Sequence, residues 1–293
     1  MSYFDDNKNA GIFGITYLDA KLNGFLKTDL VLIGARSGAG KTTLARIIAK
    51  ANARGGKKVL LMSLENFEDD DFYTDVYFKY KKITDENMSL REFLGGGEPK
   101  NKKALEQAEE EVRKENQNIT LVSRQANFTI DDIKGWMMKA MSDGYDLVII
   151  DHLDYVDKYN ANDTDNSHVT ELMKAIRDAQ DIARIPVIAF SHLRKTANAK
   201  TMPAVPSIDE FIGSSNKVKE ATIVIMLAPN DKANEELVKS GLETRKATYI
   251  AIRKDRFGGI SNKTGLVTYD LKEGRYLNGF DEEVVSYGGD VVE

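Results

Sequence analysis

A short glycine-rich segment ending in Lys-Thr-Thr has the composition of a phosphate-binding loop. Residues 35–42 read ARSGAGKT and fit the pattern G-x-x-x-x-G-K-[ST], with Ala in place of the first glycine. The glycines let backbone N–H groups turn toward an anion, Lys41 can reach the β- and γ-phosphates, and Thr42 can hold Mg²⁺. The alternative is an ordinary glycine-rich turn, which the apolar strand before the segment and the helical pattern after it disfavour. We predict that ATP, or another NTP or dNTP, is bound by Ser37, Gly38, Ala39, Gly40, Lys41, Thr42 and Thr43.

Three further polar residues follow apolar runs that read as buried strands. Asp151 ends YDLVIID, Glu65 ends KVLLMSLE, and His192 lies near the end of IPVIAFSHLRK. Open α/β sheets bind their ligands at the carboxyl ends of strands. We predict that Asp151 binds Mg²⁺, that Glu65 orients and deprotonates the attacking water, and that His192 senses the γ-phosphate. For each residue the alternative is a polar group where a strand meets water. Asp154 reads only as a loop acid that helps to place the neighbouring chain.

These residues require a sheet whose strands alternate with helices. Strand–helix alternation in the first two-thirds of the chain, followed by a strand-rich end, predicts an α/β fold. We expect a mainly parallel central sheet with an antiparallel extension and helices on both faces. The expected strands span 30–34, 58–65, 118–122, 145–156, 185–195, 221–227, 247–256 and 265–271. The expected helices span 42–54, most of 68–116, 130–142 and 169–182.

Composition narrows the class of protein. A net charge of −5 over 293 residues disfavours a generally basic nucleic-acid coat protein but allows binding through a few local loops. The absence of cysteine excludes disulfides and thiolate metal sites, and the three histidines are too scattered for a His-rich metal site. Residues 1–10 form a polar leader that lacks the apolar core of a signal peptide. No apolar run approaches the ~18 residues that cross a membrane. We therefore expect a cytoplasmic protein without a membrane partner.

The order of motifs resembles the C-terminal motor domain of the hexameric replicative helicases. This family includes the DnaB type, the bacteriophage primase-helicase type and the mitochondrial Twinkle type. The motifs are, in order, FGITYLDAKLNGF, GARSGAGKTT, LLMSLE, LVIIDHLDYV, IPVIAFSHLRK, IGSSNKVKEATIVIML and RKDRFGG. The phosphate loop and the strand ending at Asp151 are shared by many ATPases, whereas the last two motifs of this list are more specific to this family.

The resemblance implies a RecA-like phosphate-loop ATPase that forms a hexameric ring with ATP between subunits. Glu65 matches the family's catalytic glutamate and Asp151 its Mg²⁺-binding aspartate, while His192 stands where the DnaB type has Gln and the phage type has His. Arg256 matches the arginine finger given to the neighbouring subunit's nucleotide, and Lys254 matches its companion. A solvated basic turn is the alternative for these two residues.

The resemblance also sets the expected domain boundaries. It covers 11–278 as the motor domain, after the leader and before an acidic tail at 279–293. The family's N-terminal collar or primase domain does not precede the motor in this sequence, which predicts either an excised fragment or a naturally minimal protein. A primase or a polymerase is a further expected partner.

Single-stranded DNA requires positive charge only on loops that face it. Two segments, RKTANAK and GSSNKVK, supply such charge without interleaved aromatic residues, so we expect contact with the DNA backbone. The DNA-facing loops do not match the family closely, and for each lysine the alternative is a solubilising surface residue. The expected DNA-contacting residues are Lys195, Lys200, Gly213, Lys217 and Lys219.

Two functions remain open from the sequence. The first is an ATP-driven motor that translocates on single-stranded DNA and unwinds duplex. The second is a non-translocating RecA-like ATPase that assembles on DNA or recruits a replication or recombination partner. Displacement of a forked duplex distinguishes the two. A third function, a small-molecule kinase, requires a binding site for the phosphate acceptor, and none of these motifs supports one.

Overall fold

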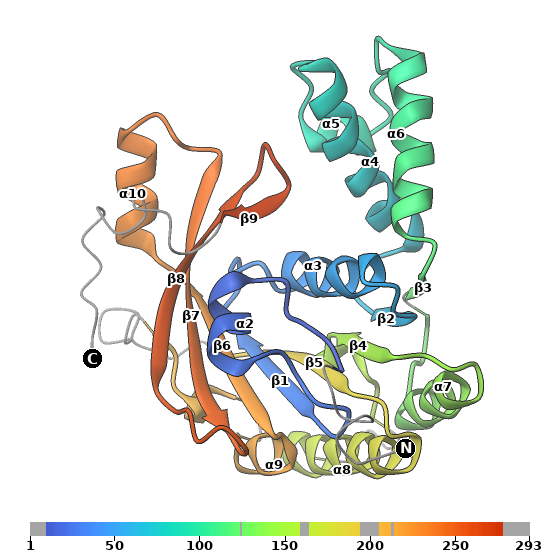
Figure 1. Cartoon of the computed structure of the whole chain (residues 1–293), viewed down its shortest axis with the longest axis vertical. Helices are drawn as coiled ribbons and strands as arrows, with labels where there is room; N and C mark the ends of the chain where they lie inside the picture. The colour runs from blue at the N-terminus through green and yellow to red at the C-terminus, as the bar shows by residue number, and fades with distance from the viewer. Residues whose placement is uncertain (1–9, 124, 159–163, 194–204, 212–213, 278–293) are drawn as a thin grey trace.

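A single mixed sheet forms the centre of the molecule. The computed structural model describes residues 10–123, 125–158, 164–193, 205–211 and 214–277. Within these ranges the strands are β1 (Leu30–Ala35), β2 (Val59–Ser63), β3 (Ile119–Ser123), β4 (Leu147–Asp151), β5 (Val187–His192), β6 (Ile223–Pro229), β7 (Arg245–Asp255), β8 (Lys263–Asp270) and β9 (Arg275–Leu277). They pair in the order β3-β2-β4-β5-β1-β6-β7-β8-β9. The first six strands of this order are parallel and the last three are antiparallel, as Figure 1 shows.

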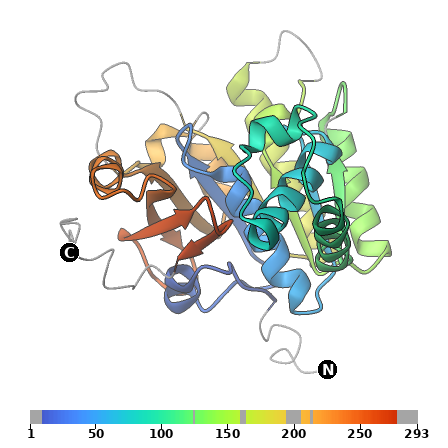
Figure 2. The same ribbon diagram turned by 90° about the horizontal axis from the view of Figure 1, so that it is seen from above.

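Helices cover both faces of the sheet. The α-helices of the described residues are α2 (Thr16–Leu22), α3 (Lys41–Arg54), α4 (Glu68–Thr84), α5 (Leu90–Leu94), α6 (Lys102–Glu115), α7 (Ile130–Ser142), α8 (Asp165–Ala183), α9 (Ser214–Glu220) and α10 (Asp231–Lys239). Alternate residues of β1 point to opposite faces, so Leu30 and Leu32 pack toward α7 and α8 while Val31 and Ile33 pack toward α2 and α3. Figures 1 and 2 show these two helical layers with the sheet between them.

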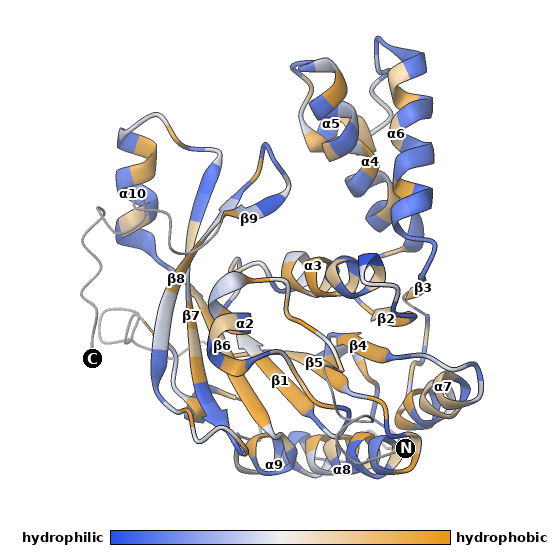
Figure 3. Cartoon of the chain, viewed as in Figure 1, coloured by the Kyte–Doolittle hydropathy of each residue, from blue (hydrophilic) through white to orange (hydrophobic). Residues whose placement is uncertain are grey.

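The strands at the centre of the sheet are buried on both faces. All six residues of β1 are buried, and the same holds for the five residues of β4. Figure 3 shows these strands as the most hydrophobic part of the chain. Strands buried on both faces read as continuous apolar runs, which is why the sequence pattern predicts them well.

Helices α4 and α6 form a second, smaller core outside the sheet. Val76 and Tyr80 of α4 pack with Ala104, Ala108 and Val112 of α6. Figure 3 shows that the rest of α6 is largely hydrophilic, as expected for a helix with one buried stripe.

The predicted fold class is confirmed, with differences at the ends of elements. The strand expected at 145–156 ends at Asp151 and is followed by a short 3₁₀ turn, Leu153–Tyr155. The short elements α9, α10 and β9 were not expected, because helices of seven to nine residues and a three-residue strand carry little periodicity. Within the described ranges, no helix combines the length and the apolar character needed to cross a lipid bilayer.

Candidate nucleotide site

The glycine-rich loop lies between the end of β1 and the start of α3. Gly38 and Gly40 have positive φ values of 78° and 84°, a backbone region that other residues rarely adopt. Among the described residues, no heavy atom lies within 4 Å of a Cβ built on Gly38, so the loop is open on that side. Lys41, Thr42 and Thr43 form the first turn of α3. The loop therefore has the shape of an anion cradle at a helix N-terminus.

The loop is anchored by an ion pair that sequence analysis did not single out. Arg36 donates to the Glu210 carboxylate from Nε at 3.1 Å and from a terminal nitrogen at 2.9 Å. Glu210 ends a short 3₁₀ helix, Ile208–Glu210, and is buried. A planar guanidinium that makes two bonds to one carboxylate fixes the direction of the loop as it leaves the sheet.

Asp151 presents a buried carboxylate beside this loop. Among the described residues, both of its oxygens are buried without a hydrogen-bond partner. Burial raises the pKa of Asp151 to about 6, and the nearby Thr42 hydroxyl and His152 oppose that shift. A buried carboxylate without partners, next to a hydroxyl, fits a divalent cation that binds oxygen ligands. No cluster of three or more His, Cys, Asp or Glu side chains occurs in the described part of the chain, so such an ion would share its coordination with phosphate and water.

Lys41 and His192 meet at the same edge of the sheet. Residues 35 and 192 are partners across β1 and β5, and the Lys41 Nζ atom lies 2.9 Å from His192 Nδ1. Burial lowers the pKa of His192, and the Lys41 charge adds to this effect. A neutral imidazole that accepts from Lys41 at Nδ1 carries its proton on Nε2. His192 therefore has a donor available for a group bound at the loop.

His152 was not identified from the sequence, and it joins Glu65 to the same site. Its ring is buried, lies 4.3 Å from the His192 ring, and places Nε2 3.6 Å from a Glu65 oxygen. Its Nδ1 atom lies 3.1 Å from an Asp154 oxygen. The only sequence signal was its place directly after Asp151. Glu65 itself remains partly exposed, as a group that contacts substrate or water would be.

The sequence and the fold of the chain are similar to those of known proteins. Residues 12–274 match the family model described as DnaB-like helicase C terminal domain. The chain belongs to this DnaB-like family. It is 22% identical over 258 residues to the replicative DNA helicase DnaB of Pasteurella multocida, covering 84% of this chain and 51% of that protein. For the DnaB of Geobacillus stearothermophilus the identity is 23% over 264 residues, covering 89% and 55%. The chain thus spans about half the length of these relatives.

Solved structures share the fold of this DnaB-like chain. The ATPase domain of G40P superposes with a TM-score of 0.74 at 19% identity, covering 94% of this chain and 93% of that one. A DnaB-like replicative helicase, described with its interactions with primase, superposes at 0.73 and 19% identity, covering 94% and 63%. A KaiC-like protein from Pyrococcus horikoshii superposes at 0.56 and 17% identity, covering 87% and 93%. These similarities confirm the RecA-like fold.

In this DnaB-like domain, Arg256 lies at the end of the sheet where β1 begins, opposite the end that carries the nucleotide site. Its backbone N–H donates to Thr222, and the Thr222 N–H donates to Leu30 at the start of β1. Lys41 follows the other end of β1. The side chain of Arg256 is exposed, and a terminal nitrogen lies 3.3 Å from the Lys219 carbonyl. The structure therefore does not bring Arg256 to the nucleotide site of its own chain.

Lys254 is engaged within its own chain. Its Nζ atom donates to the carbonyls of Val218 at 2.7 Å and Ala221 at 2.6 Å, which satisfies carbonyls at the end of α9. A role as companion to the finger stays a prediction. Of the DNA-contacting candidates, Lys219 is exposed on α9, whereas Lys195, Lys200 and Gly213 lie outside the described residues.

Lys217 corrects one expectation. Its side chain is only 1% exposed and donates to Ser191 Oγ at 2.6 Å, with an Asp154 oxygen at 3.3 Å. A lysine whose charge is paired inside the domain cannot also reach a DNA phosphate in this conformation. Helical phase explains the error, because Lys217 faces the sheet while Lys219 faces outward.

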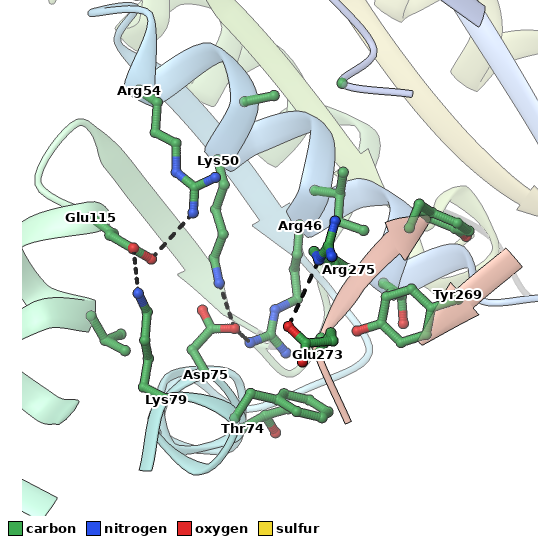
Figure 4. A pocket seen from close by; sticks show the side chains of 18 of the residues that line it. Arg46, Lys50, Arg54, Thr74, Asp75, Lys79, Glu115, Tyr269, Glu273 and Arg275 are labelled. Carbon is green, nitrogen blue, oxygen red and sulfur yellow. Dashed lines mark hydrogen bonds and ion pairs between the residues drawn. The ribbon is translucent and has the colours of Figure 1, made fainter. Parts of the chain in front are cut away.

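A cavity of about 340 Å³ opens beside the loop of the DnaB-like domain, between α3, α4 and the β8–β9 hairpin (Figure 4). Thr43, Arg46 and Lys50 line it from one face of α3, and Tyr269 and Tyr276 line it from the hairpin. Burial raises the pKa of Tyr269 to about 12 and also raises that of Tyr276, so both rings stay neutral. The volume admits a nucleoside-sized group, and the two tyrosines on one side face charged side chains of α3 and α4 on the other.

Proposed function

We propose that this chain is the ATP-hydrolysing motor of a replicative-type DNA helicase. It would assemble as a hexameric ring, hydrolyse ATP between subunits, translocate on single-stranded DNA and unwind duplex. The observation that carries the proposal is the meeting of Lys41, Asp151, His192 and Glu65 at one edge of the sheet in a member of the DnaB-like family.

Each residue has a defined task in this proposal. Lys41 and the N–H groups of the loop bind the β- and γ-phosphates. Mg²⁺, when bound, would be held by Thr42 and Asp151 and would neutralise phosphate charge. Glu65 accepts a proton from the attacking water, and His192 donates from Nε2 to the γ-phosphate.

The nucleoside end of ATP would occupy the cavity that begins at Thr43. With the phosphates at the loop, the sugar and base extend along α3 toward Tyr269 and Tyr276. Arg256 would complete the site of the adjacent subunit, since it lies at the far edge of its own sheet. A cation supplied in this way is worth about 10³-fold or more in rate.

Single-stranded DNA would contact Lys195, Lys200, Gly213 and Lys219. These contacts would be made to phosphates and would be independent of sequence. A primase or polymerase partner remains part of the proposal. Lys217 is no longer among the DNA-contacting residues, since its charge is used internally.

The test combines ATP hydrolysis with displacement of a forked DNA duplex. We expect hydrolysis that single-stranded DNA stimulates, and ATP-dependent strand displacement. Lys41→Ala should abolish both, while Lys174→Ala, which removes an exposed lysine on α8, should preserve both. Hydrolysis without displacement would favour the non-translocating assembly ATPase. Full hydrolysis by Lys41→Ala would contradict the phosphate-loop assignment.

A further inference from the structure

One ion pair in the domain joins a buried lysine to a partly exposed carboxylate and has no part in the proposed chemistry. The Lys217 ammonium, on α9, lies 3.3 Å from Asp154 Oδ1 and 2.6 Å from Ser191 Oγ. Its side chain is 1% exposed, and that of Asp154 is 24% exposed. Lys217 therefore points inward, behind the end of β5, and not toward solvent.

The Asp154 carboxylate also contacts two histidines of the nucleotide site. Asp154 Oδ2 accepts the backbone N–H of His192 at 2.7 Å and lies 3.1 Å from His152 Nδ1. His192 in turn contacts Lys41, and His152 faces Glu65. A continuous chain of polar contacts thus runs from α9 through Asp154 to the residues that would meet the γ-phosphate.

Stability alone does not account for this pair. Burying the Lys217 charge is costly, and an apolar residue of similar size at a buried position often stabilises a protein as well or better. Burial lowers the pKa of Lys217, and Asp154 opposes that shift. Burial would raise the pKa of Asp154, but the His152 hydrogen bond, then Lys217 and the His192 N–H, more than offset this and leave that pKa well below its ordinary range. The carboxylate is therefore kept ionised, as an acceptor for two neighbours.

We propose that Lys217 is a positioning residue for the nucleotide site. Its ammonium fixes the Asp154 carboxylate, and that carboxylate sets the backbone of His192 so that its imidazole faces Lys41. Without Lys217 the carboxylate would lose a charged partner and would be free to turn or protonate. The His192 ring would then no longer present Nδ1 to Lys41. This role in hydrolysis rests on the proposed function, but the contact itself does not.

The test uses Lys217→Met with nitrogen-15-labelled histidine. The chain has three histidines, so the imidazole signals can be assigned with a His192→Gln variant. In Lys217→Met we expect the nitrogen shifts of His192 to change, reporting an altered tautomer and hydrogen bond. We also expect kcat to fall by about 10-fold or more, the scale at which partners that orient reactive groups contribute, while the Kd for MgATP stays within about twofold. Lys174→Met, at an exposed position on α8, is the matched control and should change none of these.

A second variant covers the case in which Lys217→Met does not fold. Lys217→Gln keeps a polar group next to Ser191 and removes only the charge, and the Asp154 carboxylate is partly exposed, so this variant should fold and still show altered His192 signals. Unchanged His192 signals in either folded variant would overturn the proposal, as would a wild-type kcat. If the wild-type chain does not hydrolyse ATP, the proposed function is lost, but the histidine spectra still decide whether Lys217 positions His192.

Discussion

Asp151 is the residue whose charge depends most on what the site holds. Its carboxylate is buried beside Thr42, and its pKa is raised to about 6 by burial. Without a cation the proton stabilises the folded protein, because the neutral acid is cheaper to bury than the carboxylate. With Mg²⁺ and nucleotide bound, the ionised form should be preferred.

Removing this charge should change how the stability of the metal-free protein varies with pH. The folded pKa lies above the ordinary value, so the stability that Asp151 contributes is full below about pH 4 and is lost as the pH rises through about 6. Asp151→Asn should lack this loss. At pH 8 in EDTA it should exceed the wild type by up to about 3 kcal/mol in urea unfolding. MgATP should reverse the order, and equal pH profiles for the two proteins would contradict the assignment.

Glu65 should separate binding from hydrolysis. Glu65→Gln keeps the size of the side chain and removes its ability to accept a proton. We expect hydrolysis to fall by roughly 10²-fold or more, with MgATP binding by calorimetry nearly unchanged. A parallel loss of binding would make Glu65 a structural residue.

Sequence pattern predicted the individual residues that end apolar strands, but not the ones that support them. Glu65, Asp151 and His192 could be predicted to lie together because parallel strands share one edge. His152 precedes the short 3₁₀ turn that contains Asp154, and side-chain directions in so short a turn show no periodicity in the sequence. The inward direction of Lys217 was missed for a related reason, because α9 is a single short helix of seven residues.

At the level of elements, ion pairs connect helix α4 to helix α3. Figure 4 shows Asp75 of α4 between Arg46 and Lys50 of α3, with Lys50 Nζ 2.6 Å from the carboxylate. All three side chains are largely buried. Periodicity predicted both helices, but not that their contact would be ionic, because pairing between distant elements has no local signal.

Asp75→Ala should loosen α4 from the rest of the domain. Lys50 would lose the carboxylate that it pairs with, and Arg46 would keep only Asp71, so we expect a loss of about 3 kcal/mol in the free energy of unfolding. The control is Asp143→Ala, which breaks a 2.7 Å pair with Lys139 at the exposed end of α7. That change should cost much less, because water screens an exposed ion pair. Urea unfolding measures both, and similar losses would show that the α3–α4 pair is not special.

For the whole molecule, the feature that determines whether one chain can complete its own nucleotide site is the separation of Lys41 and Arg256 at opposite ends of the strands. Lys41 follows the carboxyl end of β1, whereas Arg256 lies level with its first residue. The mainly parallel sheet and its antiparallel extension could be predicted from alternating elements, whereas the order of the strands came only from the structure. The placement of Arg256 relative to a neighbouring chain rests on the family resemblance and stays a prediction.

Mixing two inactive variants tests this placement. Arg256→Ala should bind ATP almost normally and hydrolyse it poorly, and Lys41→Ala should fail at its own pocket. In rings of equal mixture, about one quarter of interfaces pair an intact pocket with an intact finger, as head-to-tail assembly requires. ATPase activity should rise to about that fraction of wild type, with single-stranded DNA strengthening the rescue. Mixtures that stay as inactive as the separate variants would favour a self-contained ATPase.

The placement of Arg256 and Lys41 at opposite ends of the sheet also affects how mutant alleles of the gene behave in a cell that carries two of them. If each active centre is shared by two neighbours, a chain damaged at Lys41 harms the centre that it carries, whereas a chain damaged at Arg256 harms the centre of its neighbour. A damaged gene copy would then interfere with an intact one, and such alleles would be dominant. Alleles damaged at opposite edges of the sheet would complement one another within a cell, whereas alleles damaged at the same edge would not.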